Sequence, residues 1–153
     1  MTTLYTLLKF LHIVGAIGWI GGYVNFSILS TRAAHETDPA VVAAMTRLMR
    51  LNGMLLIGPA SGLTLLAGIA MIAVSGLGAP LWVIWGFTAI IVSVALGAIL
   101  IRRTNEKVHE VTEAAEPDDA RLSVLQRRLM VLNIINVLVL LSAVWAMVFK
   151  PTL

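Results

Sequence analysis

The stretch LWVIWGFTAIIVSVALGAILI, residues 81–101, decides the fold of this chain. It contains no charged side chain, and a helix of this length rises about 30 Å at about 1.5 Å per residue. That rise matches the hydrocarbon core of a bilayer, which is about 30 Å thick. The segment is therefore predicted to be a transmembrane helix.

Three further apolar stretches of similar length flank it, at about residues 4–29, 54–74 and 129–149. Of the 153 residues, 59% are hydrophobic and 12% are charged, whereas soluble domains average about 45–50% apolar and about 25% charged residues. The first stretch lacks a basic leader and is too long for a secretory signal, so we expect it to remain in the mature protein. We predict an all-α integral membrane four-helix bundle in which residues 1–153 form one membrane domain.

The basic residues are distributed unevenly between the connections. Spans two and three are joined by a short uncharged turn, whereas the other two connections carry most of the basic residues, namely Arg32, Arg47, Arg50, Arg102, Arg103, Lys107, Arg121, Arg127 and Arg128. Only Lys9 and Lys150 lie on the opposite side. The positive-inside rule then predicts that the charged loops are cytoplasmic and that both termini are outside.

A short amphipathic helix is expected at about residues 39–52. Asp38 before Pro39 is a typical N-cap and first-turn pair, and Asn52 followed by Gly53 is a typical helix end. Between these signals, apolar residues recur at helical spacing. We expect this helix either to lie on the cytoplasmic membrane surface or to extend the second span.

The composition excludes several kinds of site. The chain has no cysteine, which removes disulfides, iron–sulfur clusters and c-type haem attachment. All eight acidic residues fall in the charged loops, so the buried carboxylate of proton-coupled transporters is missing. The net charge is only +3 and no basic cluster carries interleaved aromatic residues, which argues against nucleic acid as a partner.

His12 is the one histidine inside a predicted span. It lies about 12 Å from the outer helix end and shares a helical face with Gly15, Trp19 and Gly22. One interpretation is a neutral imidazole that hydrogen-bonds within the bundle. The other is a metal ligand, namely an axial ligand to haem b, because imidazole is a common haem ligand. In that interpretation Gly15 and Gly22 leave room for the porphyrin plane.

Two lysines and two methionines bear on the haem interpretation. Lys9 and Lys150 lie at the outer ends of their helices, where haem propionates would need cations. Met71 and Met147 are alternatives for a second axial ligand, although packing is their more ordinary role.

Small and polar residues predict helix contacts. Gly18 with Gly22, and Gly58 with Gly62, have the GxxxG spacing that lets transmembrane helices approach closely. These Gly-rich faces are expected to serve bundle packing or a homodimer. The asparagines of span four and the hydroxyls of span two are expected to hydrogen-bond between helices, which involves Asn133, Asn136, Ser61 and Thr64.

Residues 8–22, LKFLHIVGAIGWIGG, resemble the first helix of HemJ-type membrane protoporphyrinogen oxidases, in which a tryptophan follows the histidine after six residues. Residues 148–151, VFKP, resemble the Lys-Pro that closes their last helix, and CopD-like proteins share this loose pattern. Over its whole length the chain most resembles a bacterial family called domain of unknown function 2269, through His12, Trp19, the segment GPASGL at 58–63 and the four spans.

The resemblance implies a protein of the bacterial cytoplasmic (inner) membrane that binds haem b through His12. A redox or electron-transfer role with a quinone or another membrane redox partner would follow. The Trp-Leu-His-x-Lys element that opens the third helix of the oxidases reads WVIWG at residues 82–86 here, without the histidine and the lysine. The resemblance therefore implies the haem site more than the oxidase activity. A structural or accessory subunit without cofactor, and a small transporter, remain the alternatives.

Overall fold

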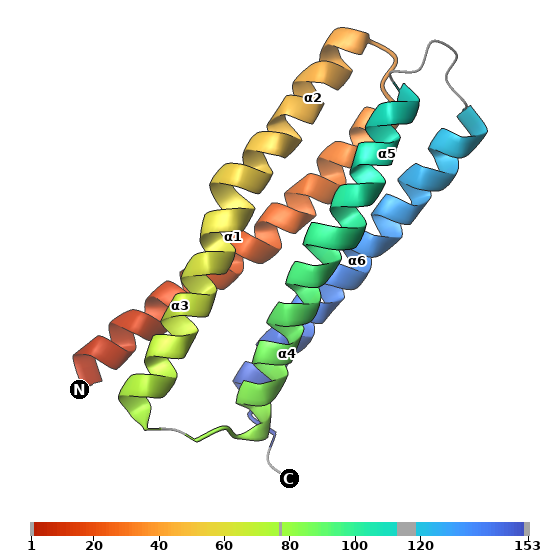
Figure 1. Cartoon of the computed structure of the whole chain (residues 1–153). Coiled ribbons are helices and arrows are strands. Elements are labelled where there is room, and N and C mark those ends of the chain that lie inside the picture. The colour runs from red at the N-terminus through yellow and green to blue at the C-terminus, as the bar shows by residue number, and fades with distance from the viewer. Residues whose placement is uncertain (1, 77, 113–118, 152–153) are drawn as a thin grey trace.

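The computed structural model describes residues 2–76, 78–112 and 119–151, and over these residues it contains helices and no strands. Two of the helices are π-helical segments inside longer rods. In chain order the helices are α1 Thr2–Ala34, α2 Pro39–Asn52, η1 Gly53–Ile57, α3 Gly58–Ser75, α4 Leu81–Ala95, η2 Leu96–Ile101, α5 Arg102–Thr112 and α6 Asp119–Phe149 (Figure 1).

These helices form four continuous rods, because α2, η1 and α3 join end to end and α4, η2 and α5 do the same. Each rod has between 30 and 36 residues and is apolar enough to cross a membrane. Such rods are about 45–54 Å long, whereas the hydrocarbon core is about 30 Å thick. The prediction of an all-α membrane four-helix bundle is confirmed, and the rods extend beyond the bilayer core.

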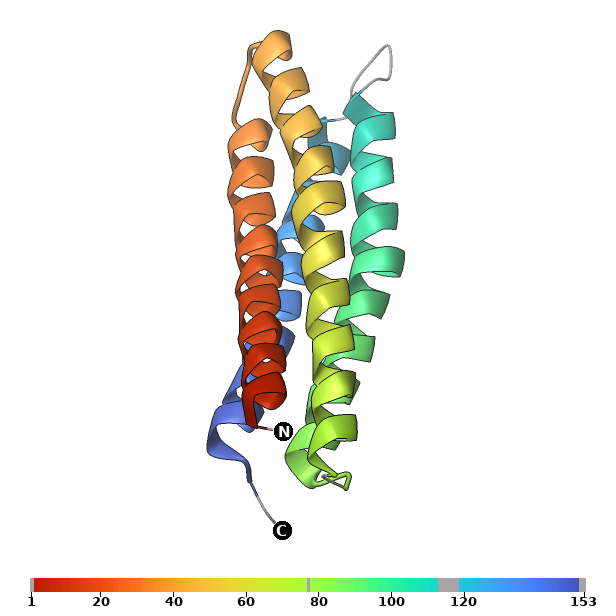
Figure 2. The same cartoon turned by 90° about the vertical axis from the view of Figure 1, so that its left-hand side faces the viewer.

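The two views place the ends of the rods consistently. The start of α1, the end of α6 and the connection from α3 to α4 lie at one end of the bundle, and the connection from α1 to α2 lies at the other (Figures 1 and 2). Many large apolar side chains on the outside are strongly exposed, as Leu55 at 71% and Ile91 at 67% show. An outer surface of this kind fits contact with lipid.

The predicted helix end at Asn52 and Gly53 is wrong. Gly53 keeps right-handed helical angles, φ −61° and ψ −45°, and the rod continues through the π-helical turn into α3. The reason is that Asn52 does not cap the helix: its side-chain amide is buried and donates to the carbonyl oxygen of Gly22 at 2.8 Å. The start signal is confirmed, because the Asp38 carboxylate accepts a hydrogen bond from the Ala40 amide. The amphipathic helix therefore extends the second span.

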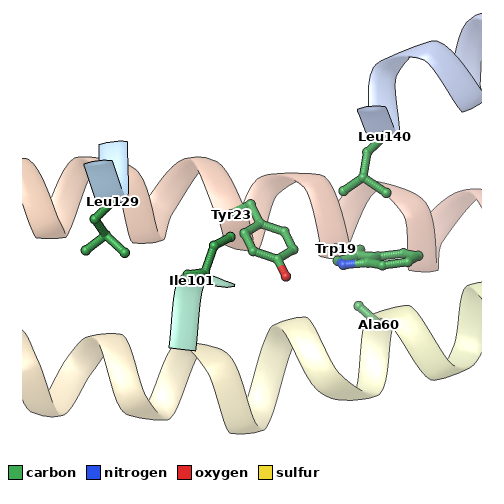
Figure 3. Packing of buried hydrophobic residues seen from close by; sticks show 6 residues of the cluster. All are labelled: Trp19, Tyr23, Ala60, Ile101, Leu129 and Leu140. Atoms are coloured by element: carbon green, nitrogen blue, oxygen red, sulfur yellow. The ribbon is translucent and has the colours of Figure 1, made fainter. Parts of the chain in front are cut away.

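The largest buried cluster draws on all four rods. Its buried residues come from α1, α3, η2 and α6, and they are Trp19, Tyr23, Ala60, Ile101, Leu129 and Leu140 (Figure 3). Around it α1 packs along α3 and against α6, and α4 packs along α6. The described parts of α3 and α4 form no comparable contact, although they follow each other in the chain. An apolar groove of about 550 Å³ separates them.

The contact between α1 and α3, called the α1–α3 seam below, depends on glycine. A Cβ atom on Gly15 would lie 2.5 Å from the Thr64 hydroxyl oxygen and 3.0 Å from the Ala60 carbonyl oxygen. One on Gly18 would lie 3.2 Å from the Ala60 Cβ. Because only glycine lets the two backbones approach this closely, the seam fixes the spacing between the first two rods.

Gly15→Ala tests the seam, with Gly21→Ala as its matched control. Both changes gain the same helix propensity, but a Cβ on Gly21 meets nothing within 4 Å. We expect Gly15→Ala to destabilise the detergent-solubilised protein by about 1–3 kcal/mol through overpacking, and Gly21→Ala to leave it unchanged or slightly more stable. Thermal unfolding measures both, and equal midpoints would contradict the seam.

Candidate functional site

His12 is half-buried on α1 and binds across the α1–α3 seam. Its Nδ1 atom lies 2.8 Å from the backbone carbonyl oxygen of Thr64. A carbonyl oxygen only accepts hydrogen bonds, so Nδ1 must carry the proton and donate. In the neutral imidazole the other nitrogen, Nε2, then keeps its lone pair. The arrangement fixes both the orientation and the tautomer of the ring.

Two residues of α3 shape the place where the ring lies. A Cβ atom on Gly68 would lie 3.1 Å from His12 Cε1 and 3.2 Å from Nδ1, so the imidazole packs directly against the bare backbone. Thr64 is buried, and its hydroxyl donates to the Ala60 carbonyl oxygen at 2.8 Å. Sequence reasoning missed Gly68, although Thr64 and Gly68 have the small-xxx-small spacing of a helix contact.

Of the two roles considered for Gly15 and Gly22, helix packing is found and room for a porphyrin is not. The space above Gly15 is taken by Thr64, and a Cβ on Gly22 would lie 2.6 Å from Ile57 Cγ1. Trp19, on the same face, is only 3% exposed and packs in the core cluster (Figure 3). The face that the sequence offered to a flat ligand is covered by α3 and η1, because helices in lipid pair through such small residues.

The two outer lysines were expected to provide cations for haem propionates. Lys9 is exposed on α1. Lys150 follows α6, and its Nζ atom lies 5.5 Å from the centre of the Trp82 ring in a cation–π arrangement. Met147 packs its methyl group against the backbone of Gly86. Among the described residues, His12 therefore hydrogen-bonds to α3 and forms no hydrogen bond with either lysine.

A layer of buried polar groups lies at the contact between α4 and α6. Asn133, Asn136 and Ser93 are fully buried, and the side-chain polar atoms of all three find no hydrogen-bond partner among the described residues. The predicted partners on span two bond elsewhere, since Ser61 donates to the Gly58 carbonyl and Thr64 to that of Ala60. That pairing between spans two and four is therefore wrong.

Tyr23 of α1 reaches into the same layer. Its hydroxyl fills the space above Gly97 of η2 and lies beside the side chains of Asn136 and Trp19, without hydrogen-bond geometry to the asparagine amide. The layer thus joins α1, the third rod and α6 through neutral polar groups. Groups of three or more His, Cys, Asp or Glu side chains that would chelate a metal ion do not occur among the described residues.

Comparison with known protein families gives a match over most of the chain. The model of a family described as "Predicted integral membrane protein (DUF2269)" matches residues 6–151. The chain belongs to this family. No curated protein and no solved structure matches the chain. Membership agrees with the four membrane-spanning rods, and the family description names neither a reaction nor a cofactor.

Proposed function

We propose that this member of the family binds haem b through Nε2 of His12 and transfers electrons within the membrane. The observation that carries the proposal is the 2.8 Å hydrogen bond from His12 Nδ1 to the Thr64 carbonyl oxygen. Histidines that bind metals commonly donate their other ring N–H to a carbonyl or carboxylate, which fixes the tautomer and makes the ligand nitrogen more basic. A half-buried imidazole in a membrane-spanning helix is also rare without a function.

His12 is suited to bind the haem iron, but the residues around it do not form a pocket for the porphyrin ring. The imidazole presents the correct nitrogen, whereas Gly15 and Gly22 are covered by the second rod, so the proposal leaves the two glycines to packing. Lys9 and Lys150 supply positive charge at the same end of the bundle for the propionates. Haem, when bound, supplies one-electron redox chemistry at a potential set by its ligand and surroundings.

The similarity of residues 8–22 to the first helix of HemJ-type oxidases and CopD-like proteins supports the same role for His12. Electron transfer by a buried haem needs a partner that exchanges electrons in the membrane, such as a quinone. A homodimer would use the Gly58–Gly62 face, because a Cβ on Gly62 meets nothing within 4 Å.

The haem proposal is tested by an absorption spectrum of protein purified with haem supplementation, before and after dithionite. We expect a Soret band that His12→Ala abolishes and that His35→Ala leaves intact, because His35 is exposed at the end of α1. A colourless wild-type protein, or a His12→Ala variant with the unchanged band, would overturn the proposal. Size-exclusion chromatography shows that each variant is folded.

A non-enzymatic structural or accessory subunit is the second candidate. The specific observation in its favour is that the glycine face of α1 packs against the second rod, which makes His12 one more interhelical hydrogen bond. This candidate predicts that the protein folds identically without haem and co-purifies with a larger complex.

We also propose that the protein lies in the bacterial cytoplasmic (inner) membrane with its charged loops inside. The chain has no cysteine, so single cysteines report the orientation directly. Thr3→Cys replaces an exposed residue near the start of α1, and Thr37→Cys replaces an exposed residue in the loop that follows α1. An impermeant maleimide applied to whole spheroplasts should label the first and not the second. The reverse pattern would place the termini inside.

A further inference from the structure

A second groove lies near the charged end of the bundle, between α1 and the α2–η1 part of the second rod. It holds about 370 Å³, and it is lined by the apolar residues Leu29, Leu48, Leu51, Leu55 and Leu56 with Asn25 and Asn52. Leu48 is 52% exposed and Leu55 is 71% exposed, so the groove is open along its outer side. We call it the α1–α2 groove.

Two arginines continue the helix faces that line the groove toward the charged end of the bundle. On α1, Asn25, Leu29 and Arg32 follow one another at helical spacing, so Arg32 continues the stripe that lines the groove. On α2, Arg47 lies one turn from Leu51 in the same way. Both arginines are exposed, and neither has an ion pair with the residues that the structure describes.

The carboxylates nearest in the chain are already bonded to backbone. Glu36 accepts hydrogen bonds from the amides of Thr37 and Asp38 through Oε1, and Asp38 caps α2 through the Ala40 amide. Neither carboxylate forms an ion pair with Arg32 or Arg47 among the described residues, so the N–H donors of both guanidinium groups are available to another anion.

The lengths of uncharged helix place the arginines at the expected depth of lipid headgroups. From Phe10 to Thr31 and from Leu51 to Ser75 the two rods carry no Asp, Glu, Lys or Arg. A stretch of 22 helical residues, such as 10–31, spans about 33 Å, close to the hydrocarbon core. Arg32 thus begins the polar boundary on α1, and Arg50 with Arg47 begins it on the second rod.

We propose that the α1–α2 groove binds one acyl chain of an anionic phospholipid, with the lipid phosphate held by Arg32 and Arg47. Apolar walls that open to the bilayer accept an acyl chain, and guanidinium groups bind phosphate through paired N–H donors. An exposed basic residue near an anionic surface favours binding by about fivefold. The proposal does not depend on haem, because none of its residues contacts His12.

Native mass spectrometry of the purified protein tests the proposal, with phosphatidylglycerol and phosphatidylcholine of identical acyl chains added in turn. The charge variant is Arg32→Gln with Arg47→Gln, and its matched control is Arg127→Gln with Arg128→Gln, two exposed arginines on α6. The groove variant is Leu51→Trp, and its control is Leu66→Trp, a 68% exposed residue outside the groove.

We expect wild type to retain phosphatidylglycerol at least tenfold more strongly than phosphatidylcholine. The Arg32 and Arg47 variant should lose most of that preference, and Leu51→Trp should lose the lipid adduct, while both controls keep wild-type behaviour. Equal retention of the two lipids, or an equal loss in the α6 variant, would overturn the proposal. A wild-type dimer that Leu51→Trp converts to monomer would instead assign the groove to a second copy. If the double variant does not fold, the two single arginine variants are tested for the same loss of preference for phosphatidylglycerol.

Discussion

The close approach of α1 to α3 is the constraint on which the rest of the bundle depends. Lipid tails are as apolar as leucine, so helices in a bilayer gain little from burying apolar surface against each other. They gain from tight backbone packing, which Gly15 and Gly18 permit against Ala60 and Thr64. The seam also brings the carbonyl groups of α3 within hydrogen-bond distance of side chains on α1, and His12 bonds to one of them.

The polar groups inside the bundle differ in whether they have a hydrogen-bond partner. His12 and Asn52 each bond a backbone carbonyl of the opposite rod at 2.8 Å, so these two bonds tie the first rod to the second at well separated levels. Asn133 and Asn136 lie fully buried without a partner among the described residues. A polar group buried without a hydrogen bond destabilises a fold by about 1–3 kcal/mol. The polar layer at α4 and α6 therefore destabilises the bundle, whereas the polar groups at the α1–α3 seam have hydrogen-bond partners.

Much of the fold could be predicted from the sequence, because uninterrupted apolar runs such as residues 81–101 report directly on the thickness of the bilayer. The helix end at Asn52 could not, since the same side chain caps a helix or bridges two helices according to what lies opposite. The sequence also left two roles open for Gly15, helix packing and room for a flat ligand, and the structure shows the packing against Thr64 and Ala60. A glycine face shows that something approaches closely, but the sequence of one helix does not say whether a ligand or another helix does.

The sequence identified His12 as a candidate, but it did not identify the residues that His12 contacts. The isolated position of His12 in an apolar helix marked it, but its partner is a backbone carbonyl, and backbone atoms leave no signal in a residue pattern. Gly68, which gives the ring its place, became visible only once α3 lay beside α1. The contact of Lys150 with the Trp82 ring likewise joins two helices and could not be read from either one alone.

The α1–α3 seam holds His12 by Nδ1 and leaves Nε2 with its lone pair. ¹⁵N NMR of the haem-free protein with labelled histidine, at a pH where the imidazole is neutral, distinguishes the protonated ring nitrogen from the bare one. The His12 signals are identified by their loss in His12→Ala. We predict that Nδ1 is protonated and Nε2 is not. A protonated Nε2 with a bare Nδ1 would contradict the account, because a bare Nδ1 has nothing to donate to the carbonyl of Thr64.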